Sequence, residues 1–418
     1  MKILQIIHDF LPRHTAGSEV YTYKLSKELV KRGHEVCLFF TEAERGTPQY
    51  TMRQGVYDEL PYFEAIVNRA YSGFTETYDN QEMERLFIEV LDRTRPDIIH
   101  LQHLINHSVG YIDIAKKRSI PIVFTLHDYW LTCPLGGQRI TADLTICHEL
   151  SPARCARCLS RYSKNSFRLK RLFGKISGKR KGTAASKASP GTGFAARSYL
   201  KVNGLFDVMA SKKLIPEVEK RLLRIIEASG DVDLFIAPSM FLKDRFVEFG
   251  IEEKKILYSD YGFDVSGFGR KKIKGHDNKK IRFGYTGSLV PHKGVHVLIE
   301  AFSGLSKASG EKAELKVYGN LTWFPDYVAK LRDKAKDTTV RFMGPFDNRD
   351  IPDVLSEIDV LVVPSIWFEN SPLTIHEAFL SGIPVITSDL GGMAELVDDN
   401  VSGLVFKTGD ADDLREKM

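Results

Sequence analysis

Two kinds of hydrophobic pattern alternate along this chain. Short apolar runs, such as KILQIIH at residues 2–8 and IDVLVVPS at residues 358–365, indicate buried strands. Segments with helical spacing lie between such runs, and one of them begins near Glu19 and is closed by Gly33. Strand, loop, helix and strand in this order predict a parallel sheet covered by helices.

The alternation occurs twice, with a break between the two series. Residues 260–280 carry turn residues and charges but no periodicity. We therefore predict an N-terminal domain at 1–262, a linker at 263–279 and a C-terminal domain at 280–418. Two such α/β domains predict a cleft between them, with the ligand at the carboxyl ends of the strands.

Composition fits this picture of a two-domain globular protein. The chain has 418 residues, of which 43% are hydrophobic and 27% are charged. Its apolar runs are shorter than the ~18 residues that a membrane helix needs, so we expect a cytoplasmic location. The sequence ends in GDADDLREKM, which is typical of a helix just beginning, so we expect that the final helices are missing.

A basic segment interrupts the first series. Residues 161–213 contain 14 Lys or Arg and one acidic residue, Asp207. One interpretation is a solvated basic insertion. The other is a surface that contacts anionic lipid at the inner face of the membrane or an anionic acceptor. We expect no nucleic-acid partner.

Four of the five cysteines lie within 26 residues, at Cys133, Cys147, Cys155 and Cys158. A cytosolic location disfavours disulfides, and the pair in CARC has a spacing typical of metal ligands. The four thiolates, or three with His148, could hold a structural zinc ion. The alternative is a set of unrelated reduced cysteines.

The stretch IWFENSPLTIHEAF contains a candidate anion site. Ser371 is the predicted N-cap of a helix and Pro372 its first residue. The N-terminus of a helix binds phosphate, whereas Glu369 and Glu377 would repel it, so both carboxylates suit sugar or ribose hydroxyls. The alternative is a capped surface helix with two solvated glutamates.

Three further residues follow predicted strands. Lys293 opens a helix, where its charge could neutralise phosphate, although a surface lysine is the plainer interpretation. Gly17 permits close backbone approach, without the G-x-G-x-x-G spacing of a dinucleotide site. His127 lies at the carboxyl end of a strand, as either a site residue or a structural histidine.

These stretches together resemble retaining glycosyltransferases of family 4. The likeness runs from AGSEVYTYKLSKELVKRGHEV to GGMAELVDDNVSGLVFKTGDADDL. Its most specific part is the E-x7-E pattern of Glu369 and Glu377, followed by GIPVITSDLGGMAELV, and GSLVPHKGVHVLIEAF is a second block. The resemblance implies the α/β GT-B fold, two Rossmann-like doubly wound parallel-sheet domains facing a cleft.

The resemblance also implies roles for both domains. The C-terminal domain would bind a UDP-, GDP- or ADP-sugar, and the N-terminal domain a saccharide or lipid-linked acceptor. Glu377 would hold the ribose, Glu369 the donor sugar and Lys293 the diphosphate, with His127 at the reacting end of the cleft. The implied catalytic residues are His127, Lys293 and Glu369. The implied donor-binding residues are Gly17, Ser288, Lys293, Glu369, Asn370, Ser371, Pro372, Leu373, Thr374 and Glu377. No catalytic metal is expected, so zinc at the cysteines would be structural.

One position departs from the family pattern. Ser288 stands where the family often has an arginine that shares the diphosphate with the lysine. Arg13 and His292 are candidates for the missing cation. The expected function is sugar transfer in cell-envelope polysaccharide or glycoconjugate synthesis. The alternatives are a non-catalytic GT-B-like binding or regulatory subunit, and a phosphorylase or epimerase acting on a sugar nucleotide.

Overall fold

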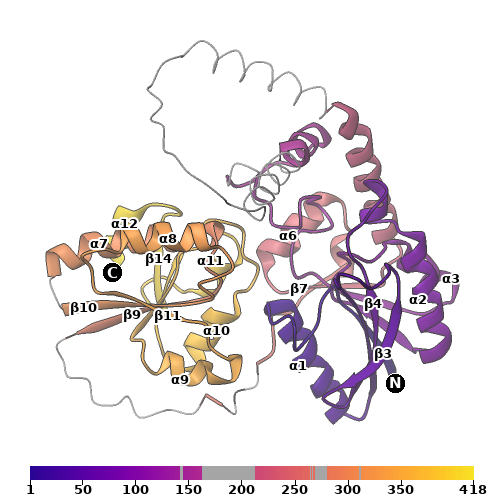
Figure 1. Ribbon diagram of the computed structural model, residues 1–418, viewed down its shortest axis with the longest axis horizontal. Helices are drawn as coiled ribbons and strands as arrows, with labels where there is room; N and C mark the ends of the chain where they lie inside the picture. The colour runs from indigo at the N-terminus through magenta and orange to yellow at the C-terminus, as the bar shows by residue number, and fades with distance from the viewer. Residues whose placement is uncertain (142–144, 162–211, 264, 266, 269–279, 310–311) are drawn as a thin grey trace, which may run out of the picture.

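The computed structural model describes residues 1–418 except 142–144, 162–211, 264, 266, 269–279 and 310–311. The described part forms two α/β domains, each built on one sheet (Figure 1). This confirms the predicted arrangement of two domains with mainly parallel sheets. Nearly all of the predicted basic insertion at 161–213 and most of the predicted linker lie outside the described residues.

The N-terminal sheet has eight strands in the order β3-β4-β2-β1-β5-β6-β7-β8. All neighbours run parallel except β3, which pairs antiparallel with β4. Its strands are β1 (Lys2–Ile6), β2 (Glu35–Glu42), β3 (Met52–Tyr57), β4 (Leu60–Ile66), β5 (Ile98–Leu101), β6 (Ile122–Thr125), β7 (Leu234–Ala237) and β8 (Ile256–Tyr258). Its helices are α1 (Gly17–Lys31), η1 (Thr75–Thr77), α2 (Gln81–Thr94), α3 (Gly110–Lys117), α6 (Met240–Phe249) and η2 (Glu253–Lys255), with helical residues also at 152–161 and 212–229.

The C-terminal sheet has six parallel strands in the order β11-β10-β9-β12-β13-β14. They are β9 (Ile281–Thr286), β10 (Ala313–Tyr318), β11 (Val340–Gly344), β12 (Val360–Val363), β13 (Val385–Ser388) and β14 (Gly403–Phe406). The helices are η3 (Pro291–Lys293), α7 (Val295–Ser309), α8 (Pro325–Lys334), η5 (Asn348–Asp350), α9 (Ile351–Leu355), α10 (Leu373–Leu380), α11 (Gly392–Leu396) and α12 (Ala411–Lys417).

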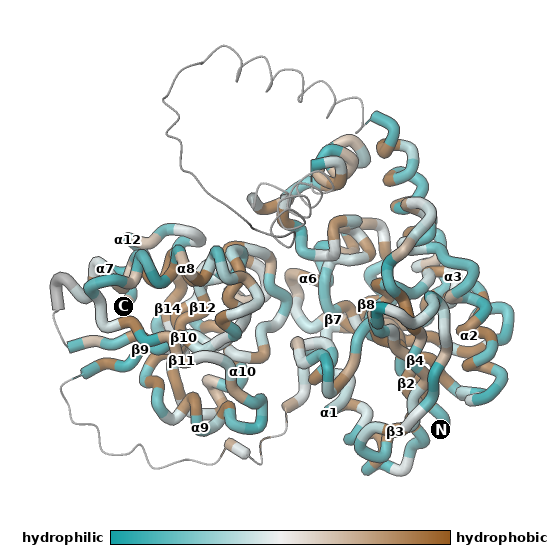
Figure 2. Tube along the Cα trace, in the orientation of Figure 1, coloured by the Kyte–Doolittle hydropathy of each residue, from teal (hydrophilic) through white to brown (hydrophobic). Residues whose placement is uncertain are grey.

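Burial on both faces explains the apolar strands. The four residues of β13 are all buried, as are three of the four in β12. Helices cover both sides of a parallel sheet, so its strands need apolar side chains on both faces. Figure 2 shows hydrophobic segments gathered around the sheets of both domains. No helix in the described ranges is long and apolar enough to cross a membrane.

The two domains meet along α1 and α6 on one side and α10 and α11 on the other (Figure 1). Phe368 of the C-terminal domain is buried against rings of the N-terminal domain, 5.1 Å from Phe241 and 6.2 Å from Tyr129 between centroids. Glu395 on α11 accepts hydrogen bonds from the backbone N–H groups of Met240, at 2.8 Å, and Phe241. A carboxylate at the N-terminus of α6 also complements the helix dipole, so this contact holds the domains together.

A tight backbone contact places Lys293. Gly294 follows Lys293 with φ +70°, and a Cβ there would lie 1.7 Å from the carbonyl oxygen of Pro364. The N–H of Ile366 donates to the carbonyl of His292 at 2.9 Å. The loop after β9 and the loop after β12 are therefore joined, and only glycine fits the contact.

The Gly294 contact can be tested against a matched glycine. Gly382 has nearly the same φ, +71°, but its Cβ would meet nothing within 4 Å. Gly382→Ala should cost about 1 kcal/mol of unfolding free energy through the left-handed backbone alone. Gly294→Ala should cost at least about 2 kcal/mol more, because the backbone must also move. Urea midpoints measure both, and equal losses would contradict the contact.

Candidate active site

An ion pair between the half-buried Lys293 and the buried Glu369 lies at the centre of the candidate site. The Lys293 ammonium is 2.5 Å from Oε1 of Glu369, and the Ser365 hydroxyl donates to the same oxygen at 2.7 Å. Burial alone would raise the pKa of Glu369, but Lys293 and these hydrogen bonds hold it below its usual value. The Lys293 ammonium also lies 5.1 Å from the ring centroid of Trp367, a cation–π contact. Glu369 thus stays ionised and fixes the position of the lysine.

The start of α10 differs from the prediction by one residue. Pro372, not Ser371, is the N-cap, and no side chain caps the helix. The Ser371 hydroxyl donates instead to Asp260 Oδ1 at 2.6 Å and lies 2.7 Å from His376 Nε2. The predicted N-cap at Ser371 was therefore wrong, because a distant carboxylate takes its hydroxyl. The uncapped N–H groups of the first turn are left for water or an anion.

Glu377 lies inside α10 and is half-buried. Burial raises its pKa to about 7, against the opposing charges of Lys24 and His376. Within the described part of the chain, its carboxylate makes no hydrogen bond to another residue. The group is therefore partly protonated near neutral pH, unlike Glu369.

His127 approaches the site from the N-terminal domain. One ring nitrogen lies 2.7 Å from Gln102 Oε1 and the other 2.9 Å from the Tyr261 hydroxyl. Because a carbonyl oxygen only accepts, Nε2 carries the proton, and Nδ1 accepts from the tyrosine. Burial lowers the pKa of His127 well below its usual value, so the ring is neutral. Its carbonyl oxygen accepts from the side chain of Asn370, which ties it to the loop that holds Glu369.

The structure brings most of the implied donor-binding residues to this junction. A Cβ on Gly17 would lie 3.7 Å from Leu373, so α1 begins beside the first residue of α10. Thr374 follows in the first turn. Ser288 lies in the loop after β9, where its carbonyl, not its hydroxyl, accepts from Tyr285 at 2.8 Å.

The two predicted substitutes for the missing arginine differ in charge. Arg13 forms ion pairs with the buried carboxylates Glu42, at 2.7 Å, and Glu64. As for Lys293, such a pair does not exclude a further contact with phosphate, so Arg13 stays a prediction. Burial lowers the pKa of His292 to about 4, so its ring is uncharged at neutral pH and does not supply the missing cation.

The structure does not assemble the four cysteines into a metal site. All four residues are described, yet no three of their sulfurs lie within 4.8 Å of one another. Cys133 belongs to the main core, whereas Cys155 packs in a small apolar cluster, and burial raises the pKa of both thiols. Protonated, buried thiols behave as apolar side chains, so this geometry does not support the predicted zinc site.

Several residues at the site escaped the sequence analysis. Ser365 follows the apolar run of β12, and this position after a strand is the one feature of the sequence that could have identified it. Asp260 stands in a stretch without periodicity, and Tyr261 and Gln102 contact His127 only through the fold. Such partners are distant in sequence, so spacing could not reveal them.

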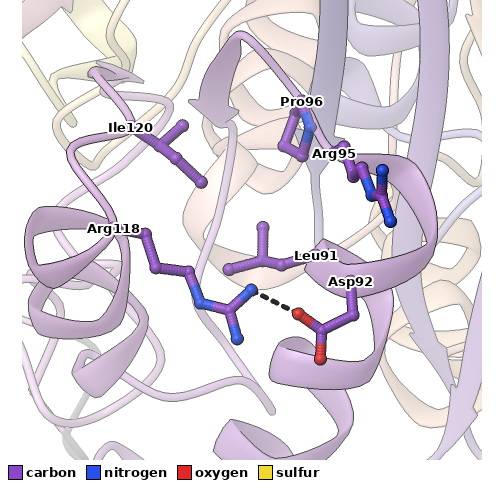
Figure 3. A pocket seen from close by; sticks show the side chains of 6 residues that line it. All are labelled: Leu91, Asp92, Arg95, Pro96, Arg118 and Ile120. Atoms are coloured by element: carbon purple, nitrogen blue, oxygen red, sulfur yellow. Dashed lines mark hydrogen bonds and ion pairs between the residues drawn. The ribbon is translucent and has the colours of Figure 1, made fainter.

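A separate surface pocket lies away from this junction (Figure 3). Its lining includes Pro96 and Ile120, which precede β5 and β6, and an ion pair of 2.5 Å between Arg118 and Asp92. It therefore lies at the amino edge of the sheet. Open α/β sheets bind ligands at the opposite edge, so we assign this pocket no function.

Two family models match this sequence. Glycosyltransferase Family 4 matches residues 15–171, and Glycosyl transferases group 1 matches residues 270–418. The chain belongs to glycosyltransferase family 4. The two matches fall on the two domains and include Gly17, Lys293, Glu369 and Glu377.

Proteins from several bacteria are also similar in sequence to this chain. The colanic acid biosynthesis glycosyltransferase WcaL of Salmonella typhimurium, named as putative, is 26% identical over 44% of the chain and 47% of its own length. The putative glycosyltransferase YtcC of Bacillus subtilis is 32% identical over 43% of the chain and 49% of its own length. An uncharacterized 42.6 kDa protein in the cps region of Klebsiella pneumoniae is 22% identical over 95% of the chain and 87% of its own length. The chain spans about half the length of most of the curated relatives it matches.

Solved structures confirm the GT-B fold. HepE of Anabaena in complex with UDP and glucose superposes with a TM-score of 0.60 at 17% identity, covering all of this chain and 88% of that one. Sucrose-phosphate synthase from Thermosynechococcus elongatus gives a TM-score of 0.63 at 15% identity, with the same coverage. At this identity the likeness shows the fold alone.

The raised pKa of Glu377 predicts a pH-dependent stability. The folded state holds a proton up to about pH 7, whereas the unfolded chain releases it near the ordinary value of 4.5. The stabilising contribution is therefore complete below 4.5 and is lost as pH rises to about 7. Glutamine cannot ionise, so Glu377→Gln should raise the free energy of unfolding more at about pH 8 than at about pH 4.5. Allowing for the partial exposure of Glu377, we expect the difference between the two pH values to be about 2 kcal/mol.

Urea midpoints at the two pH values measure this difference. Glu28→Gln is the control, because Glu28 is an exposed residue of α1. The account of Glu377 fails if the substitution has the same effect at both pH values.

Proposed function

We propose that this chain is a retaining glycosyltransferase that moves a sugar from a nucleotide-sugar donor to a hydroxyl of a saccharide or lipid-linked acceptor. The observation that carries the proposal is the Lys293–Glu369 ion pair in the loops before the uncapped start of α10, where Asn370 donates to the backbone carbonyl of His127 in the other domain. The names of WcaL and of the Klebsiella protein support a role in cell-surface polysaccharide synthesis.

The diphosphate would bind between Lys293 and the first turn of α10. An ammonium has three N–H donors, so Lys293 can keep its bond to Glu369 and still donate to a phosphate oxygen. Departure of the nucleoside diphosphate builds charge on the leaving phosphate. A lysine already held in place, with free N–H groups of α10 beside it, would stabilise that charge without reorganising.

The two glutamates would bind the rest of the donor. Lys293 and Ser365 both contact Oε1 of Glu369, so we expect a hydroxyl of the donor sugar at Oε2. Glu377 would accept hydrogen bonds from the ribose hydroxyls in its ionised form. Its raised pKa then means that donor binding and deprotonation favour each other.

His127 would orient the reaction but not act as its base. Its neutral ring already donates to Gln102 and accepts from Tyr261, so neither nitrogen is free for the acceptor proton. The leaving phosphate would take that proton, and no catalytic metal is required by this scheme. Closure of the domains around the donor would exclude water and favour transfer over hydrolysis.

Lys293→Ala tests the proposal most simply. It should lower the rate of nucleoside diphosphate release from the accepted nucleotide-sugar at least about tenfold, equal to about 1.4 kcal/mol of barrier. The donor is first chosen by thermal-shift screening of UDP-, GDP- and ADP-sugars. Lys316→Ala is the matched control, because Lys316 is also ion-paired, 3.0 Å from Glu357, but lies on β10.

Unchanged turnover in Lys293→Ala would contradict the assignment of Lys293. A wild-type chain that binds a nucleotide-sugar and turns over none would favour a non-catalytic binding subunit instead.

A further inference from the structure

A cluster of three side chains lies in the N-terminal domain, apart from the residues assigned to the donor. His8 and Asp9 follow β1, and Glu19 lies in the first turn of α1. One potential ligand atom from each lies within 4.8 Å of the other two. In the part of the chain that the structure describes, no other three His, Cys, Asp or Glu side chains are this close. The β1 strand and α1 helix bring the three together at the carboxyl edge of the sheet.

The spacing inside the cluster suits a shared ion better than direct contacts. Nε2 of His8 lies 3.8 Å from Oε1 of Glu19 and 4.0 Å from Oδ2 of Asp9. Both separations are too long for a hydrogen bond. Two ligand atoms that each lie about 2.1 Å from a metal ion are roughly 3.4 Å apart at a tetrahedral angle. The two separations from His8 are therefore within about 0.6 Å of this value.

The two carboxylates lack a cation of their own. Glu19 is buried, and its other oxygen accepts from the Ser18 hydroxyl at 2.9 Å, which leaves Oε1 facing His8. The nearest basic group to Asp9 outside the cluster is Nδ1 of His14, at 3.8 Å.

His8 has a ring nitrogen without a partner, because Nδ1 is buried and makes no hydrogen bond to any residue that the structure describes. Its ring lies 4.4 Å from the ring of His103, between centroids. His103 accepts from the N–H of Ile105 and therefore donates through Nε2 to Asp128, at 3.0 Å. Nε2 of His8 faces the two carboxylates of the cluster, so an imidazole nitrogen is available to a metal ion.

We propose that His8, Asp9 and Glu19 bind a divalent transition-metal ion at the carboxyl edge of the N-terminal sheet. One imidazole and two carboxylates form a ligand set suited to Mn²⁺ or Zn²⁺. Three protein ligands leave coordination positions open for water or for an oxygen of an acceptor. The site shares no residue with the donor site built on Lys293, and it does not depend on the proposed function.

Titration of the full chain with MnCl₂ and with ZnCl₂, after treatment with EDTA, tests this site. Isothermal titration calorimetry should show one stoichiometric site for at least one of the two ions. Asp9→Asn and Glu19→Gln should each weaken binding at least about tenfold. Circular dichroism of each variant checks that it is folded.

Glu28→Gln is the matched control, because it removes an exposed carboxylate from the same helix. It should bind the ion as the wild type does. An anomalous difference peak between His8, Asp9 and Glu19 in crystals grown with MnCl₂ or ZnCl₂ would place the ion directly. No binding at millimolar concentrations of either ion would overturn the proposal. Equal affinity of the folded Asp9→Asn and Glu19→Gln variants would overturn it too. Neither result tests Lys293, so the metal site can be wrong while the proposed sugar transfer is right, and the reverse.

Discussion

The buried ion pair of Lys293 and Glu369 is the contact on which the candidate site depends. It joins the loop after β9 to the loop after β12, where Gly294 and Pro364 already touch. The charge of the buried Glu369 needs this partner, because an unpaired buried ion costs several kcal/mol. The neighbours of Glu369 on either side, Phe368 and Asn370, anchor the same loop to the N-terminal domain. One short segment thus fixes the lysine, starts α10 and joins the domains.

Under the proposed function, the site would act on a diphosphate with few charges. Ser288 stands where the family pattern often has an arginine, and the His292 ring is neutral. Positive charge would come from Lys293 and from the N–H groups at the start of α10. Preorganised groups in a buried site stabilise developing charge better than mobile groups in water. A rigid loop would then compensate in part for the absent arginine.

The sequence predicted the features that repeat and missed those that depend on single distant contacts. Apolar runs separated by helical segments were enough for both sheets, because parallel strands must be apolar on both faces. Glu369 and Glu377 were identified through their spacing and the family resemblance, not through the hydrophobic pattern. The N-cap was misplaced because Asp260 lies 111 residues before Ser371 and takes its hydroxyl. The clustered cysteines suggested zinc, yet Cys133 and Cys155 pack in two different apolar clusters, and no three of the four sulfurs lie within 4.8 Å of one another.

A crystal structure of the chain with UDP would test the central claim most directly. The account predicts a phosphate oxygen within hydrogen-bond distance of Nζ of Lys293, close to the N–H groups that begin α10. It also predicts that Glu369 keeps its contact with Lys293 and that Glu377 faces the ribose. A diphosphate bound elsewhere, with Lys293 still touching only Glu369, would contradict the account.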